Sequence, residues 1–103
     1  MINDNEYQEG KILQSSWGYE QTNVDFYKIV KRTAKSVLLQ EIGKIKTESG
    51  NMSGEAVPDI SIEIGKPFRR KLLIHGDSIL GCHFQYGTIR AWEGRPAYYS
   101  TYA

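Results

Sequence analysis

Asp59-Ile60-Ser61-Ile62-Glu63-Ile64 is the stretch of sequence that decides the fold class, because its polar and apolar residues alternate strictly. Successive side chains of a β-strand point to opposite faces, so this pattern places the isoleucines on one face and the polar residues on the other. Alternation of this kind is typical of a half-buried strand. The stretch therefore predicts a β-strand whose isoleucines face a hydrophobic core.

A second β-rich region lies upstream of this stretch. Val24 to Arg32 and Ser36 to Ile45 are rich in β-branched and aromatic residues, which favour strands, and Thr33-Ala34-Lys35 can join them as a hairpin. The same region also carries apolar residues at helical spacing. The hairpin is favoured, and an α+β fold with one helix near residues 24–45 stays open as the alternative.

Short apolar runs separated by turn residues fill most of the remaining chain. Further strands are expected at residues 12–19, 68–74, 78–86, 88–92 and 97–101. Residues 47–58 contain two glycines and a proline and are interpreted as a loop, and the polar residues 1–9 as a flexible arm. The sequence predicts one mainly β domain over residues 10–103, a small antiparallel barrel or highly bent sheet that is SH3-like in scale.

Composition and charge restrict the class of function. The 103 residues fit one globular domain, with 40% hydrophobic and 24% charged residues. No apolar run is long enough to cross a membrane, and the single cysteine fits a reducing compartment, so a cytoplasmic location is expected. The formal net charge of +1 excludes a DNA mimic, which must present a densely acidic surface.

Catalytic and metal-binding signatures are weak. Cys82 and His83 are adjacent, so on a strand they point to opposite faces and cannot act together. His75 and Asp77 flank a predicted turn and support a hydrolase only as a remote alternative. Two histidines and one cysteine without regular spacing do not form a zinc motif, and no glycine-rich phosphate loop is present. We expect a protein that is not an enzyme and needs no cofactor or metal.

Three segments of the chain resemble small proteins encoded by bacteriophages, prophages and plasmids. The segments are Ser16 to Tyr27, with the sequence SWGYEQTNVDFY, then Pro58 to Lys71, and Ala91 to Pro96, with the sequence AWEGRP. The resemblance implies an origin in a mobile element and action in the cytoplasm of a bacterial host. It also suggests a binding role, such as inhibition of a host defence nuclease of the CRISPR type.

Two sets of residues are candidates for binding a macromolecule. Large aromatic and arginine side chains typical of protein-binding hot spots are Trp17, Tyr19, Tyr27, Trp92, Arg95 and Tyr98. Basic residues that could contact phosphates are Lys28, Lys31, Arg32, Arg69, Arg70, Lys71 and Arg90. Binding of a host or phage protein is the favoured hypothesis, and nucleic-acid binding on a small barrel is the alternative.

Overall fold

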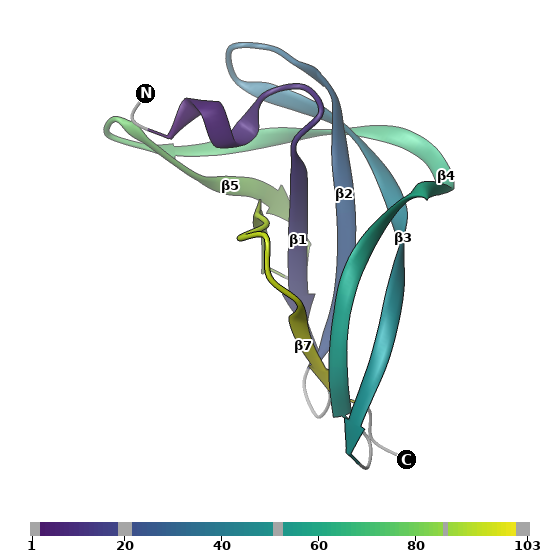
Figure 1. The fold of residues 1–103 in the computed structure, drawn as a ribbon. Coiled ribbons are helices and arrows are strands. Elements are labelled where there is room, and N and C mark those ends of the chain that lie inside the picture. Colours follow the sequence, from purple (N-terminus) through teal and green to yellow (C-terminus); the bar gives the residue numbers. More distant parts are fainter. Residues whose placement is uncertain (1–2, 19–21, 51–52, 86, 101–103) are drawn as a thin grey trace.

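The computed structural model describes residues 3–18, 22–50, 53–85 and 87–100, and these form a mainly β structure (Figure 1). A short 3-10 helix, η1, spans Asp4–Tyr7. The strands are β1 (Ile12–Trp17), β2 (Asn23–Arg32), β3 (Ser36–Gly50), β4 (Ser53–His75), β5 (Ser78–Phe84), β6 (Gly87–Ala91) and β7 (Ala97–Ser100). The predicted hairpin over residues 24–45 is confirmed, so the helical alternative is wrong.

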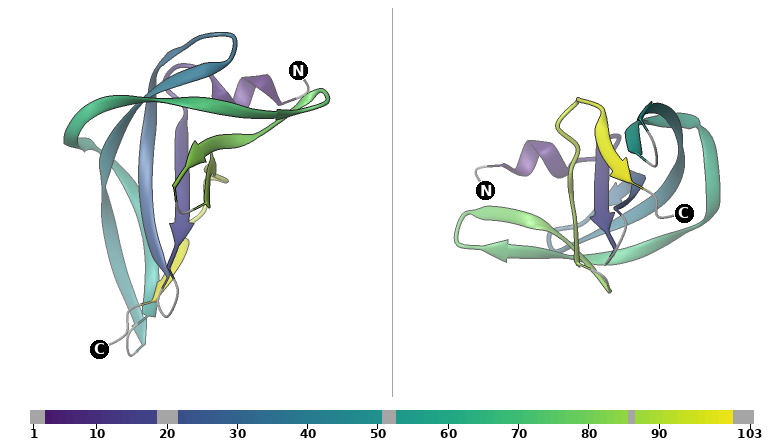
Figure 2. Two further views of the ribbon diagram at one scale, coloured as in Figure 1. Left: turned by 180° about the vertical axis from the view of Figure 1, so that it is seen from behind. Right: turned by 90° about the horizontal axis from the view of Figure 1, so that it is seen from below.

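The strands form one antiparallel sheet that bends until its hydrogen-bonded ladders close into a ring. Their order is β3-β2-β1-β6-β5-β4-β7, and an additional pairing of β3 with β4 closes the ring. The long β3–β4 hairpin extends beyond this ring, and the first part of β4 pairs with β7 (Figures 1 and 2). The predicted small, highly bent antiparallel sheet is therefore confirmed.

Strand β2 lies between two hydrophobic clusters, one on each face. Tyr27 and Ile29 point into the larger cluster, whereas Val24 and Phe26 point into the smaller one. The larger cluster lies within the ring and its buried members are Tyr7, Leu13, Tyr27, Ile29, Val37, Leu39, Leu72, Ile79, Cys82 and Ile89. The smaller cluster consists of Val24, Phe26, Ile42, Ala56, Ala97 and Tyr99. This two-sided burial explains the dense apolar content of β2.

The prediction of a flexible arm over residues 1–9 is wrong for the part that the structure describes. Tyr7 is only 3% exposed and belongs to the larger cluster. The side chain of Asn3 donates to the carbonyl oxygen of Ile79 and accepts from its N–H, both at 2.7 Å. Asp4 forms an ion pair with Arg32 at 2.8 Å. Long-range contacts therefore fix a segment that has no periodicity of its own.

The predicted loop at residues 47–58 is also wrong, because β3 and β4 continue through most of it as a paired hairpin. Thr47 pairs with Glu55, and Lys44 pairs with Pro58. Gly54 is required by packing, since a Cβ there would lie 2.3 Å from the carbonyl oxygen of Thr47. The glycine in this segment permits close approach of backbones, a role that composition does not distinguish from a turn.

Among the residues that the structure describes, no helix is long and apolar enough to cross a membrane.

Candidate functional site

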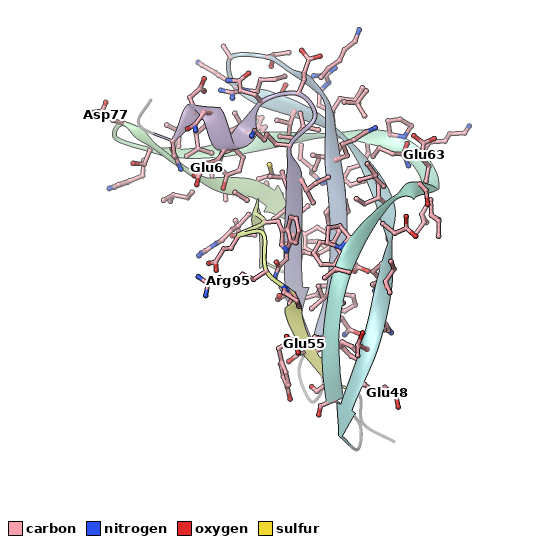
Figure 3. All side chains as sticks on the ribbon, viewed as in Figure 1. Glu6, Glu48, Glu55, Glu63, Asp77 and Arg95 are labelled. Atoms are coloured by element: carbon pink, nitrogen blue, oxygen red, sulfur yellow. The ribbon has the colours of Figure 1, made fainter. Side chains whose placement is uncertain are left out.

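The candidate catalytic residues are either exposed at a turn or divided between the two faces of a strand. His75 and Asp77 are exposed at the β4–β5 turn, where Figure 3 shows Asp77 at the tip of the hairpin. Cys82 is fully buried and its neighbour His83 is exposed, as the strand pattern predicts. The described parts of the chain contain no group of three or more histidine, cysteine or acidic residues that could hold a metal ion.

The predicted aromatic hot spots do not form one surface. Tyr27 is 3% exposed and packs edge-on against Phe68 in the larger cluster, so its assignment to a binding surface is wrong. Trp92 is half-buried, packs edge-on against Phe26 and donates its indole N–H to the carbonyl oxygen of Arg95. Arg95 and Tyr98 are exposed, and Tyr19 lies outside the described residues.

Trp17 is held by a polar network near the end of β1 and the start of β2. Its indole N–H donates to Asp25 at 3.1 Å, and Asp25 also forms an ion pair with Lys44 at 3.0 Å. Lys44 donates a further hydrogen bond to the carbonyl oxygen of Val24. Burial raises the pKa of nearby Glu41, and the negative charge of Asp25 adds to this effect. These contacts assign Asp25 a structural role in orienting Trp17.

Strand register divides the predicted basic residues between the two faces of the sheet. Residues that pair directly in an antiparallel sheet point to the same face, and Leu38 pairs with Lys31 on one side and Arg69 on the other. The partners of the next residues on that face of β3, two positions away, are Lys28 and Lys71. Lys28, Lys31, Arg69 and Lys71 therefore share one face, which we call the basic face.

The other predicted basic residues lie elsewhere. Arg32 has a side chain that is only 8% exposed and is held by Asp4 and the carbonyl oxygen of Tyr7, so its assignment as a phosphate ligand is wrong. Arg70 points away from the basic face and stacks over the ring of Phe68 at 4.5 Å. Arg90 is exposed on β6, across the ring from the basic face.

Three isoleucines of β4 that the sequence pattern predicts to be buried lie on the surface. Ile60, Ile62 and Ile64 are 63%, 48% and 46% exposed, so the prediction that they face the core is wrong. They lie where β4 bends at the edge of the molecule, and Figure 3 shows Glu63 projecting from this bend. We call residues 60–64 the isoleucine bend. Its three large aliphatic side chains present an apolar surface to solvent.

Irregular pairing between β3 and β4 produces this exposure. Ile42 and Gly43 are adjacent on β3, yet their partners Glu63 and Asp59 are four residues apart, so the three residues between them bulge from the ladder. A second shift separates the partners of Leu39 and Glu41. The bulges lift the strand from the sheet and turn its isoleucines outward.

Polar contacts hold the isoleucine bend in place. Gln40 is 4% exposed, and its amide donates to the carbonyl oxygens of Ile64 and Gly65 at 3.0 and 3.2 Å. The N–H and hydroxyl of Ser61 donate to the carboxylate of Asp59, which lowers the pKa of that carboxyl group. These hydrogen bonds satisfy backbone groups that the sheet ladder leaves unpaired at the bulge.

Gly43 completes the support of the bend from β3. A Cβ at Gly43 would lie 2.8 Å from the Cβ of Ile62, so only glycine allows Ile62 to lie over the strand. The sequence signal for this arrangement is the glycine within the apolar β3 segment, but it does not identify the contacting residue.

Comparison with family models, curated proteins and solved structures found no match to this chain.

Proposed function

We propose that this protein acts by binding another protein and that the isoleucine bend is the contact surface. The observation that carries the proposal is the exposure of three isoleucines within five consecutive residues, at a bend fixed by the buried amide of Gln40. Single exposed hydrophobic residues are ordinary, whereas clustered ones are typical of interaction sites. A rigid bend also costs little conformational entropy on binding.

The residues around the isoleucine bend support the same proposal. Asp59, Glu63 and Lys66 flank or interrupt the isoleucines and provide a charged rim. Protein interfaces commonly combine an apolar centre with a polar rim, which excludes water and sets the orientation of the partner. The complementary partner is a protein with an apolar groove bordered by charged groups.

The resemblance to phage, prophage and plasmid proteins suggests the kind of partner. A protein from a mobile element meets host proteins in the bacterial cytoplasm, and we propose a host protein, such as a defence nuclease of the CRISPR type, as the target. Binding alone is sufficient to block such an enzyme, and this role requires no catalytic group, metal or cofactor in the inhibitor.

Serine substitution in the isoleucine bend is expected to weaken partner binding strongly. The double variant Ile60→Ser/Ile62→Ser should weaken binding by about 30-fold or more, because loss of a hot spot costs about 2 kcal/mol or more. The measurement is affinity capture from nuclease-treated host lysate, followed by titration with the purified partner. Leu80→Ser is the matched control, because Leu80 is 51% exposed on β5. Equal loss in both variants would contradict a role specific to the bend.

The basic face supports nucleic-acid binding as a second candidate function. Within the described parts of the chain, no acidic side chain forms an ion pair with Lys28, Lys31, Arg69 or Lys71. Such a face can contact phosphates without reading base sequence.

Salt dependence distinguishes this second candidate. If the basic face binds nucleic acid, the logarithm of affinity should fall with the logarithm of salt concentration by about 0.9 for each phosphate contact. Arg69→Ala should reduce that slope by about one unit. Arg70→Ala is the matched control, because Arg70 points to the opposite face and stacks on Phe68. Equal effects of the two variants, or an absence of salt-sensitive binding, would exclude this function for the basic face.

A further inference from the structure

The strand ladder opens between β1 and β6, on the side of the ring opposite the β3–β4 pairing. β1 and β6 pair at only two positions, Leu13 with Ala91 and Gln14 with Arg90. Continued pairing would bring Ser15 opposite Ile89 and then Ser16 opposite Thr88. The ladder ends before both pairs, although β1 continues to Trp17 and β6 begins at Gly87. Two strand segments therefore separate and leave facing edges.

Two hydrogen bonds at the start of β1 establish where the main-chain groups of these edges point. The carbonyl oxygen of Lys11 accepts from Ile29 on β2, whereas that of Ile12 accepts from Trp92, which follows β6. Main-chain groups alternate in direction along a strand, and β1 pairs with β2 without a register shift from Ile12 to Trp17. Ser16 therefore directs its N–H and carbonyl groups away from β2. The N–H of Trp92 points toward β1, and Thr88 lies an even number of residues before it. The N–H and carbonyl groups of Thr88 therefore also point toward β1.

A groove occupies the opening between these edges. Its volume is about 580 Å³, and its lining includes Ser16 of β1, Thr88 and Arg90 of β6, and Glu93 and Arg95, which follow β6. This volume falls within the range of about 300–1,000 Å³ that is usual for ligand sites. The groove lies on different strands from the isoleucine bend, and Figure 3 shows Arg95 and Glu63 on separate sides of the molecule.

The charges that line the groove favour an acidic ligand. Among the described residues, two arginines, Arg90 and Arg95, and one carboxylate, that of Glu93, line the groove. The contact between Arg95 and Glu93 is long, at 3.7 Å, and joins side chains that are 82% and 78% exposed. A pair this exposed is weak, so both arginines can bind other carboxylates.

We propose that this groove binds an extended acidic peptide segment of a partner protein, which adds as a strand to the free edge of β1 at Ser16. Main-chain hydrogen bonds provide affinity in this mode of recognition, and alternate side chains provide specificity. One face of the added strand places its carboxylates against Arg90 and Arg95. The site is independent of the isoleucine bend, so the two proposals can fail separately.

Proline at position 16 tests the proposal through the backbone. Ser16→Pro removes only an N–H that points away from β2, so the β1–β2 ladder remains, and proline is tolerated at such edge positions. The probe is a fluorescein-labelled seven-residue peptide of alternating glutamate and valine, followed by fluorescence anisotropy. Ser16→Pro should weaken its binding about tenfold or more. Ser16→Ala is the matched control and should bind as the wild type does, since it retains the N–H.

Two further measurements do not depend on the folding of the proline variant. A peptide that carries N-methyl groups on alternate residues should not bind the wild-type protein, and neither should a peptide of alternating lysine and valine. In amide NMR spectra, the acidic peptide should shift the Ser16 and Thr88 resonances. The proposal is overturned if the N-methylated or basic peptide binds equally well, if neither resonance shifts, or if a folded Ser16→Pro variant binds as the wild type does.

Discussion

Tyr7→Ala is expected to lower the free energy of unfolding by about 3–5 kcal/mol, the usual cost of removing a large buried aromatic side chain. Tyr7 is 3% exposed, and its ring packs among the residues of the larger cluster. Its hydroxyl accepts a hydrogen bond from the N–H of Ala91 at 3.1 Å, a contact between positions 84 residues apart. The substitution therefore creates a cavity and leaves a main-chain donor without its partner.

Residues of the N-terminal segment also contact the side chain of Arg32, which is largely buried. Arg32, which is 8% exposed at its side chain, donates to the carbonyl oxygen of Tyr7 at 3.0 Å and pairs with Asp4 at 2.8 Å. The Asp4 side chain is 39% exposed, so solvent screens this ion pair and its loss alone costs about 1 kcal/mol or less. Deleting residues 1–9 removes the Tyr7 ring as well as both of these partners of Arg32. Deletion of residues 1–9 should therefore destabilise the protein at least as strongly as Tyr7→Ala.

Thermal or urea unfolding measures both effects. A loss of 3 kcal/mol or more should lower the midpoint temperature by more than about 10 °C in a domain of this size. Glu6→Ala is the matched control, because Glu6 is exposed on the same short helix and its loss should change stability by less than about 0.5 kcal/mol. Similar midpoints for Tyr7→Ala and the wild type would show that the segment is a loose arm in solution.

Local pattern was sufficient to predict the strands but not the tertiary contacts of the N-terminal segment. The β-branched and aromatic residues of β2 and β3 agree with their strand structure, and Thr33 to Lys35 form the predicted connection. Asn3 and Tyr7 carry no such signal, because their partners Ile79 and Ala91 lie more than 70 residues away. Polar composition alone makes this segment resemble a disordered terminus.

The isoleucine bend shows a different limit of sequence analysis. Alternation correctly predicts a strand, but the side of that strand that faces solvent depends on register. The bulges opposite Ile42 and Gly43 change the register locally, and the buried amide of Gln40 makes the resulting geometry stable. The sequence around Gln40 and Gly43 does not indicate that they support the bend, because each contacts residues about 20 positions away.

The sequence identifies the types of residue that can form a binding surface, but it does not show which of them share a face. Lys31 and Arg69 are basic and share a face, whereas Arg32 and Arg70 have the same charge and lie on the other face. Tyr27 has the composition of a hot spot but fills the core. The pairing register determines which of these side chains face the core and which face solvent. That register depends on how the strands pair around the whole ring.

Alkaline pH is expected to destabilise the protein through Cys82. Burial raises the pKa of its thiol from 9.0 to about 12, and Arg32 opposes this effect only in part. Between these values the unfolded chain loses the thiol proton while the folded chain retains it. Stability is therefore fully present below pH 9 and falls as pH rises toward 12, by about 1.4 kcal/mol for each pH unit.

The difference between the wild type and Cys82→Ala isolates this effect, because the other titrating groups are common to both proteins. Burial also raises the pKa of Tyr7 and Tyr27, so both proteins should lose stability at high pH. The wild type should lose more, and its stability relative to the variant should fall steadily in urea titrations from pH 9 to pH 11. A constant difference over that range would mean that the thiol ionises without unfolding. The expected decline instead ties the charge state of Cys82 to the closed core of the ring, where burial excludes the water that would stabilise a thiolate.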